Sequence, residues 1–228
     1  MHASISVAAA LPLTVQLIDL FAALLLLLAF AMLAQRRVMN LVNLFAAQGA
    51  LLAASAALVA YSTGHGELYA SAALTLLLKV LVLPYVLQGM IRRLRAEWDA
   101  ETLVNIPTLQ IIGIVLVIFA FVLAQPISGF AGAATRSTLG IAVALVLLAF
   151  LMMIVRRKAI AQVVGFLAME NGLLFAAVTA TQGMPMVVEL GIALDVLVGV
   201  FILGVFFFQI REQFDSLDLQ HLETMKDE

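Results

Sequence analysis

Two acidic side chains interrupt the long apolar stretches near the end of the chain: Glu170 and, 25 residues later, Asp195. An ionised carboxylate in hydrocarbon costs about 2.5–3.5 kcal/mol on insertion scales. Carboxylates at such positions face a bundle interior or a wet cavity, where they exchange protons, bind a substrate or hold helices together. Glu170 and Asp195 are therefore the first candidates for chemistry in this sequence.

A basic residue, Lys79, stands in the middle of another apolar stretch, about twelve residues or ~18 Å of helix from either end. An ammonium at that depth cannot easily reach water, so Lys79 is expected to face protein or a wet cavity and to have a carboxylate partner. Pro84 follows about one turn later, lacks a backbone donor and clashes with the carbonyl of Val80. We therefore expect a bent or opened helix beside Lys79.

A lysine with two carboxylates can keep one ion pair while the second carboxylate exchanges a proton. Burial favours the protonated form of a carboxyl group, whereas a neighbouring ammonium favours the ionised form. A small movement of Lys79 would then change the proton affinity of Glu170 or Asp195. The alternative is a buried ion pair that only fixes helix register, although such pairs often stabilise no more than an apolar replacement would.

The composition indicates an integral membrane protein embedded in a lipid bilayer. Of 228 residues, 64% are hydrophobic and 11% are charged, against about 45–50% and about 25% in soluble domains. Apolar runs of some 20 residues fit helices rather than the alternating strands of a barrel. The net charge of −2 gives no reason to expect a nucleic-acid partner.

Redox cofactors are not expected. The chain has no cysteine, which excludes disulfides, thiolate nucleophiles and cysteine-ligated iron–sulfur clusters. Its three histidines, His2, His65 and His221, all lie outside the apolar runs, so haem ligation within the membrane is not expected. We expect no cofactor, no metal and no catalytic residue in this chain.

The hydropathy pattern predicts an all-α polytopic membrane protein with about seven transmembrane helices. These helices are expected at about residues 11–34, 38–61, 67–91, 106–125, 138–155, 159–181 and 186–210. The loops after the first, third and fifth are basic, containing Arg36 and Arg37; Arg92, Arg93 and Arg95; and Arg156, Arg157 and Lys158. The other loops contain only Arg136. The positive-inside rule therefore places the N-terminus outside and the C-terminus in the cytoplasm of a bacterial inner membrane.

The chain divides into four parts by chemistry. Residues 1–105 form an N-terminal three-helix unit with Lys79, and residues 106–155 form two uncharged packing helices. Residues 156–210 form a helix pair with Glu170 and Asp195, and residues 211–228 form a polar, acidic cytoplasmic tail.

Four further polar residues are possible accessories to the buried charges: Gln48, Glu67, Asn171 and Glu189. Buried amides such as that of Gln48 usually bond across helix contacts, where they add about 0.6–2 kcal/mol. Glu189 falls in the first turn of the last expected helix, near the outer surface. It is either a partner of that helix's N-terminal dipole or an outer port of a proton path.

The sequence resembles the hydrogenase-4 component E family of membrane subunits of formate hydrogenlyase-type, group 4 nickel–iron hydrogenases. The resemblance lies in residues 165–172 (GFLAMENG), 189–195 (ELGIALD), 72–84 (AALTLLLKVLVLP) and the tail around 217–226. The C-terminal part also resembles subunit K of respiratory complex I and the C subunit of multisubunit cation/proton antiporters. Glu170 and Asp195 match the two membrane glutamates of those subunits, with Asp195 in place of the second.

The resemblance implies a non-redox subunit, working with large antiporter-like membrane subunits and a peripheral nickel–iron hydrogenase or related redox arm. Glu170 and Asp195 would exchange protons, with Lys79 as their electrostatic modulator. An independent secondary transporter and a purely structural scaffold remain as alternatives. The sequence does not distinguish H⁺ from Na⁺, and it does not reveal the direction of transport or the electron donor.

Overall fold

The computed structural model describes residues 13–64, 66–93, 102–125 and 133–180. Its elements are α1 (Leu13–Ala34), α2 (Val38–Thr63), α3 (Gly66–Thr75), the π-helix η1 (Leu76–Val82), α4 (Leu83–Arg93), α5 (Ile106–Ala124), α6 (Ala133–Val155) and α7 (Ala159–Ala180). The expected seventh membrane helix and the acidic tail lie outside the described residues, and so do Glu189 and Asp195.

Within the described ranges, six helices are long and apolar enough to cross a membrane. Elements α3, η1 and α4 together provide one of them, Tyr69–Gly89. The β-pairing described is a single isolated bridge between Thr102 and Arg156, at the ends of two helices. The prediction of an all-α polytopic membrane protein is therefore confirmed.

The helix boundaries agree closely with the hydropathy pattern except at the start of α6. That helix begins at Ala133, five residues before the expected start near residue 138. Its additional first turns, AATRS, contain two alanines and an arginine, which are strong helix formers. The glycine- and alanine-rich connection between the fourth and fifth expected helices, residues 126–137, is thus shorter than the sequence suggested. Arg136 belongs to a helix.

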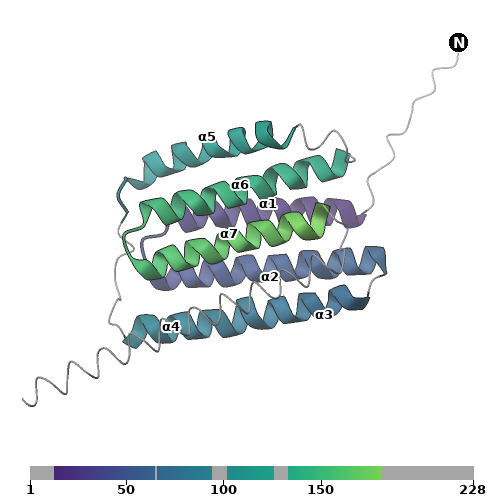
Figure 1. Cartoon of the computed structure of the whole chain (residues 1–228), viewed down its shortest axis with the longest axis horizontal. Coiled ribbons are helices and arrows are strands. Elements are labelled where there is room, and N and C mark those ends of the chain that lie inside the picture. Colours follow the sequence, from purple (N-terminus) through teal and green to yellow (C-terminus); the bar gives the residue numbers. More distant parts are fainter. Residues whose placement is uncertain (1–12, 65, 94–101, 126–132, 181–228) are drawn as a thin grey trace, which may run out of the picture.

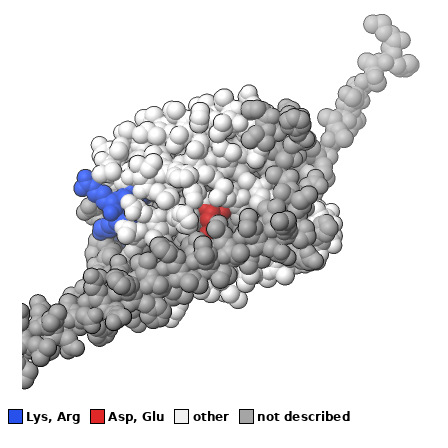
Figure 2. All heavy atoms as spheres, in the orientation of Figure 1, with Lys and Arg blue, Asp and Glu red and all other residues white. Residues whose placement is uncertain are grey.

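All the helices run side by side in one bundle, with α5 and α3–α4 at opposite edges (Figure 1). Element α2 contacts α1, α3, η1, α4 and α7, so it is the central helix of the described part. The ends of α1, α4 and α6 and the starts of α2, α5 and α7 lie at the same end of the bundle. Figure 2 shows lysine and arginine side chains gathered at that end, and from the positive-inside rule we expect this end to face the cytoplasm.

Close packing between α6 and α7 depends on two glycines of α7, two turns apart. A Cβ atom on Gly165 would lie 2.8 Å from Met153 Cγ, and one on Gly172 would lie 3.1 Å from the backbone nitrogen of Val146. Small residues at such contacts let two membrane helices approach closely. The pair therefore holds the Glu170 segment at a fixed depth.

Candidate functional site: a buried lysine between an amide and a carboxylate

Lys79 lies at the centre of the π-helix η1 and at the midpoint of the span Tyr69–Gly89. The helix closes with the backbone N–H of Leu83 bonded to the carbonyl of Leu78, five residues back. Pro84 comes next, cannot donate a backbone bond and would clash with a carbonyl four residues before it. A wider turn accommodates these constraints, so the expected opening of the helix takes the form of π geometry, which is frequent at functional sites.

The Lys79 side chain has no exposure, and an amide from another membrane span, α7, is its hydrogen-bond partner. Its Nζ donates a hydrogen bond of 2.8 Å to Oδ1 of Asn171 in α7. The carboxylate of the preceding residue, Glu170, is also nearby, with Oε1 3.9 Å from Nζ. That distance is an ion pair but too long for a hydrogen bond.

Asn171 connects the lysine to α2. Its Nδ2 donates a hydrogen bond of 3.2 Å to Oε1 of Gln48. Both amides are buried, Asn171 at 1% and Gln48 at 1% exposure. Because an amide has one acceptor end and one donor end, this chain of bonds fixes which way Asn171 points. Its oxygen is thereby held toward the ammonium.

Gly49, the residue after Gln48, provides the space for the lysine stem. A Cβ atom on Gly49 would lie only 2.9 Å from Cβ of Lys79 and 3.5 Å from its backbone carbonyl carbon. Contacts this short are essentially never found between real side chains, so any larger residue would push α2 and η1 apart. The site is therefore built from three membrane spans, with a glycine at their closest approach.

Among the described residues, this arrangement holds the lysine cation against an amide and beside an acid. The ammonium is anchored by the Asn171 amide, whether Glu170 is ionised or protonated. Charges interact more strongly in a protein interior than in water. Movement of Nζ by about 1 Å from the amide toward Glu170 would convert a loose ion pair into a charge-assisted hydrogen bond.

The other candidates fall into two groups. Gln48 and Asn171, expected as accessories, lie in the site, and Pro84 is the second residue after its π-helix. Glu67 belongs to the first turn of α3, far along the same span from Lys79, and its side chain lies outside what the structure describes. Asp195 and Glu189 also lie outside the described residues, so their roles stay predictions.

Two features of the site were not anticipated from the sequence. Asn171, rather than a carboxylate, is the closer partner of Lys79, and nothing local indicates a contact across 92 positions. Gly49 was not singled out, although a glycine next to a buried glutamine in a membrane helix is a signal of close helix approach.

Comparison with known proteins reveals two kinds of relative. The chain is 34% identical over 212 residues to "Uncharacterized protein Rv0085" of Mycobacterium tuberculosis (strain ATCC 25618 / H37Rv), covering 92% of this chain and 96% of that protein. It is 25% identical over 186 residues to "Hydrogenase-4 component E" of Escherichia coli (strain K12), covering 82% and 81% respectively. The Shigella flexneri protein of that name matches equally. No family model matches, and no solved structure matches significantly.

Proposed function

We propose, from the premise that this chain belongs to the same family as the Rv0085 protein of Mycobacterium tuberculosis, that it is a membrane subunit of a hydrogenase-like complex. The more distant similarity to hydrogenase-4 component E supports that assignment, because it extends over four fifths of both chains. The subunit would be non-redox and would reside in a bacterial inner membrane. Its role would be proton translocation driven by electron transfer in partner subunits.

The observation that carries the proposal is the fully buried Lys79 with Glu170 3.9 Å away. A scaffold gains little from such a pair, since desolvation of both charges offsets their attraction. A proton carrier needs an acid whose affinity for a proton can be altered by a nearby charge. The Asn171 amide, oriented by Gln48, holds the Lys79 ammonium in a position from which it can move toward Glu170.

In the proposed cycle Glu170 takes up a proton while the ammonium rests on Asn171. Approach of Lys79 to Glu170 then favours the ionised form and releases the proton. Lys79 lies in π geometry, which is frequent at functional sites. Asp195 is proposed as the next proton acceptor, and large antiporter-like subunits with a peripheral nickel–iron hydrogenase or related redox arm are proposed as partners.

The test measures proton translocation by the intact complex in inverted membrane vesicles. The variants are Glu170→Gln and Asp195→Asn, which remove titration but nearly preserve shape. We expect assembled complexes whose proton translocation per electron falls ~10-fold or more, because loss of a positioned acid removes that proton step. Arg157→Gln, at an exposed site outside the spans, is the control and should translocate at the parental rate.

Each alternative gives a different result. Proton translocation at the parental rate in both acid variants would establish the scaffold role and contradict the proton-relay proposal. Ion transport by the purified chain alone, in proteoliposomes without partners, would establish an independent transporter. Replacing sodium by choline in the assay medium separates Na⁺ coupling from H⁺ coupling.

A further inference from the structure

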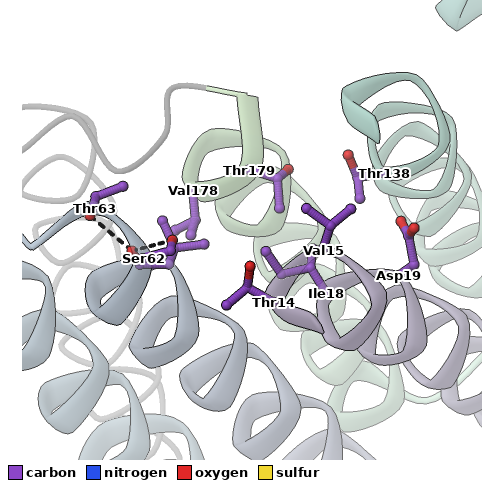
Figure 3. Close-up of a pocket in the computed structure, with 10 residues that line it drawn as sticks. Thr14, Val15, Ile18, Asp19, Ser62, Thr63, Thr138, Val178 and Thr179 are labelled. Carbon is purple, nitrogen blue, oxygen red and sulfur yellow. Dashed lines mark hydrogen bonds between the residues drawn. The ribbon is translucent and has the colours of Figure 1, made fainter. Parts of the chain in front are cut away.

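A second polar region lies at the outer end of the bundle, remote from Lys79. There α1, α2, α6 and α7 enclose a partly open cavity of about 300 Å³. Figure 3 shows the side chains around it, and the polar ones are Thr14, Asp19, Ser62, Thr63, Thr138 and Thr179. Liquid water occupies about 30 Å³ per molecule, so the cavity has space for several waters or a hydrated ion.

Three of the hydroxyl groups around this cavity donate their hydrogens to backbone carbonyls. Ser62 Oγ and Thr63 Oγ1 both donate to the carbonyl of Val59, at 2.9 Å and 2.8 Å. Thr179 Oγ1 donates to the carbonyl of Phe175 at 2.7 Å. A hydroxyl has a single hydrogen but two lone pairs. Each of these three oxygens therefore keeps lone pairs with which it can accept a bond or contact a cation.

Asp19 determines the charge of the cavity. Its Oδ1 accepts a hydrogen bond of 3.1 Å from Ser137 Oγ, which connects α1 to α6. The carboxylate has a second oxygen, and an ionised carboxylate can only accept. Helices α2 and α7 end at the cavity while α1 and α6 begin there, so their dipoles oppose one another and the carboxylate sets the sign.

We propose that this cavity is an outward-facing binding site for a small monovalent cation, sodium or hydronium, balanced by Asp19 and solvated by the hydroxyl oxygens. Oxygen-only surroundings suit hard cations. One carboxylate matches one positive charge, whereas calcium binds six to eight oxygens, often several of them carboxylate. Within the described ranges, moreover, no three His, Cys, Asp or Glu side chains come together as ligands, as a multivalent metal ion would need.

The cavity is distinct from the lysine site. Thr179 lies eight residues, or ~12 Å of helix, beyond Asn171 in α7. Phe175, between these two residues in α7, is a buried apolar side chain, and the buried Val178 and Val59 form apolar walls of the cavity. The proposed cation site can therefore be tested separately, and either proposal can fail without the other.

The experiment measures equilibrium binding of radioactive sodium to the full-length purified chain, with choline replacing the other cations. The key variant is Asp19→Asn, whose side-chain oxygen can still accept the bond from Ser137. We expect sodium affinity to fall by ~10-fold or more when the charge is removed. Arg157→Gln, which removes a charge at an exposed position at the other end of the bundle, is the control and should bind sodium as the parent does.

A second variant, Thr179→Val, removes one acceptor while keeping side-chain shape, and should weaken binding by a smaller factor. Competition of protons with sodium between pH 6 and 8 would show that hydronium uses the same site, and its absence would assign the site to sodium alone. No sodium binding by the parent, together with proton uptake that is unchanged in Asp19→Asn, would overturn the proposal. Equal sodium affinity of the parent and Asp19→Asn would overturn it as well.

Discussion

At the residue scale, the position of the buried ammonium depends on the absence of a side chain at residue 49. Gly49 lets α2 contact the stem of Lys79, and Gln48 beside it orients the Asn171 amide. The lysine, the two amides and Glu170 thus act as one unit. A change that moves α2 should disturb the cluster without touching a polar atom.

The variant Gly49→Ala tests this dependence. Its Cβ would lie 2.9 Å from Lys79 Cβ, so the helices must separate. We expect a loss of about 1–3 kcal/mol in the free energy of unfolding, as for overpacked cores, measured by denaturant titration in detergent. The control is Gly89→Ala, which has nothing within 4 Å and should be neutral or slightly stabilising. Equal behaviour of the two variants would contradict the close approach.

The sequence was informative about single residues where the cost of burial is high. A lysine in mid-membrane must be enclosed, and Lys79 is enclosed, with Glu170 within ion-pair distance. Amide geometry was not predictable, because Asn171 meets residues 92 and 123 positions away. No local sequence pattern indicates a contact between residues so far apart in the chain. The outer cavity was missed for the same reason, as its hydroxyls come from four separate helices.

At the element scale, Arg156 has a structural role that was not predictable from the sequence, where it is one of three basic residues in a loop. The side chain is 2% exposed and donates to the carbonyls of Met32 and Leu33, at 2.9 Å and 3.3 Å. Those carbonyls belong to the last turn of α1, where the regular helical bonds run out; the Met32 carbonyl also accepts a 3.3 Å bond from the backbone N–H of Gln35. Burial lowers the pKa of the Arg156 guanidinium through desolvation, but arginine remains protonated in proteins. It therefore caps α1 with a full positive charge.

We expect Arg156→Ala to destabilise the protein by about 1.5–3 kcal/mol, the usual cost of hydrogen bonds to a charged group. Arg157→Ala, at the exposed neighbouring position, should change stability by less than about 0.5 kcal/mol. Arg156→Lys should recover part of the loss, because the lysine ammonium keeps the positive charge and can still donate to backbone carbonyls. Thermal unfolding of the three variants in detergent provides the comparison. A loss in Arg157→Ala as large as that in Arg156→Ala would refute the cap.

At the scale of the whole molecule, hydropathy predicted the fold class and nearly every helix boundary. Apolar runs are long because every backbone group in a bilayer must be bonded within its own helix. The order of packing was not predictable in the same way. Helix α2 is central and α5 lies at an edge, although the sequence of α5 is the more apolar of the two.

The orientation of the bundle can be tested directly because the chain has no native cysteine. Ser62→Cys lies at the expected outer end and Arg157→Cys at the expected cytoplasmic end, both exposed. A membrane-impermeant maleimide should label only the first in intact spheroplasts and only the second in inverted vesicles. Ser55→Cys, at a position with 0% exposure, should remain unlabelled in both. The reverse pattern would invert the topology and place the Asp19 cavity on the cytoplasmic side.

The tight contact of α6 with α7 has a consequence for how the protein is made. Of the six spans, α7 is the least hydropathic and α6 the most. Only three residues, 156–158, separate the two helices, and Gly165 and Gly172 fit α7 against its neighbour. We therefore expect α7 to leave the translocon together with α6 as a helical hairpin, not as a single segment. The strongly apolar α6 would then bring the Glu170 carboxylate into the membrane during synthesis.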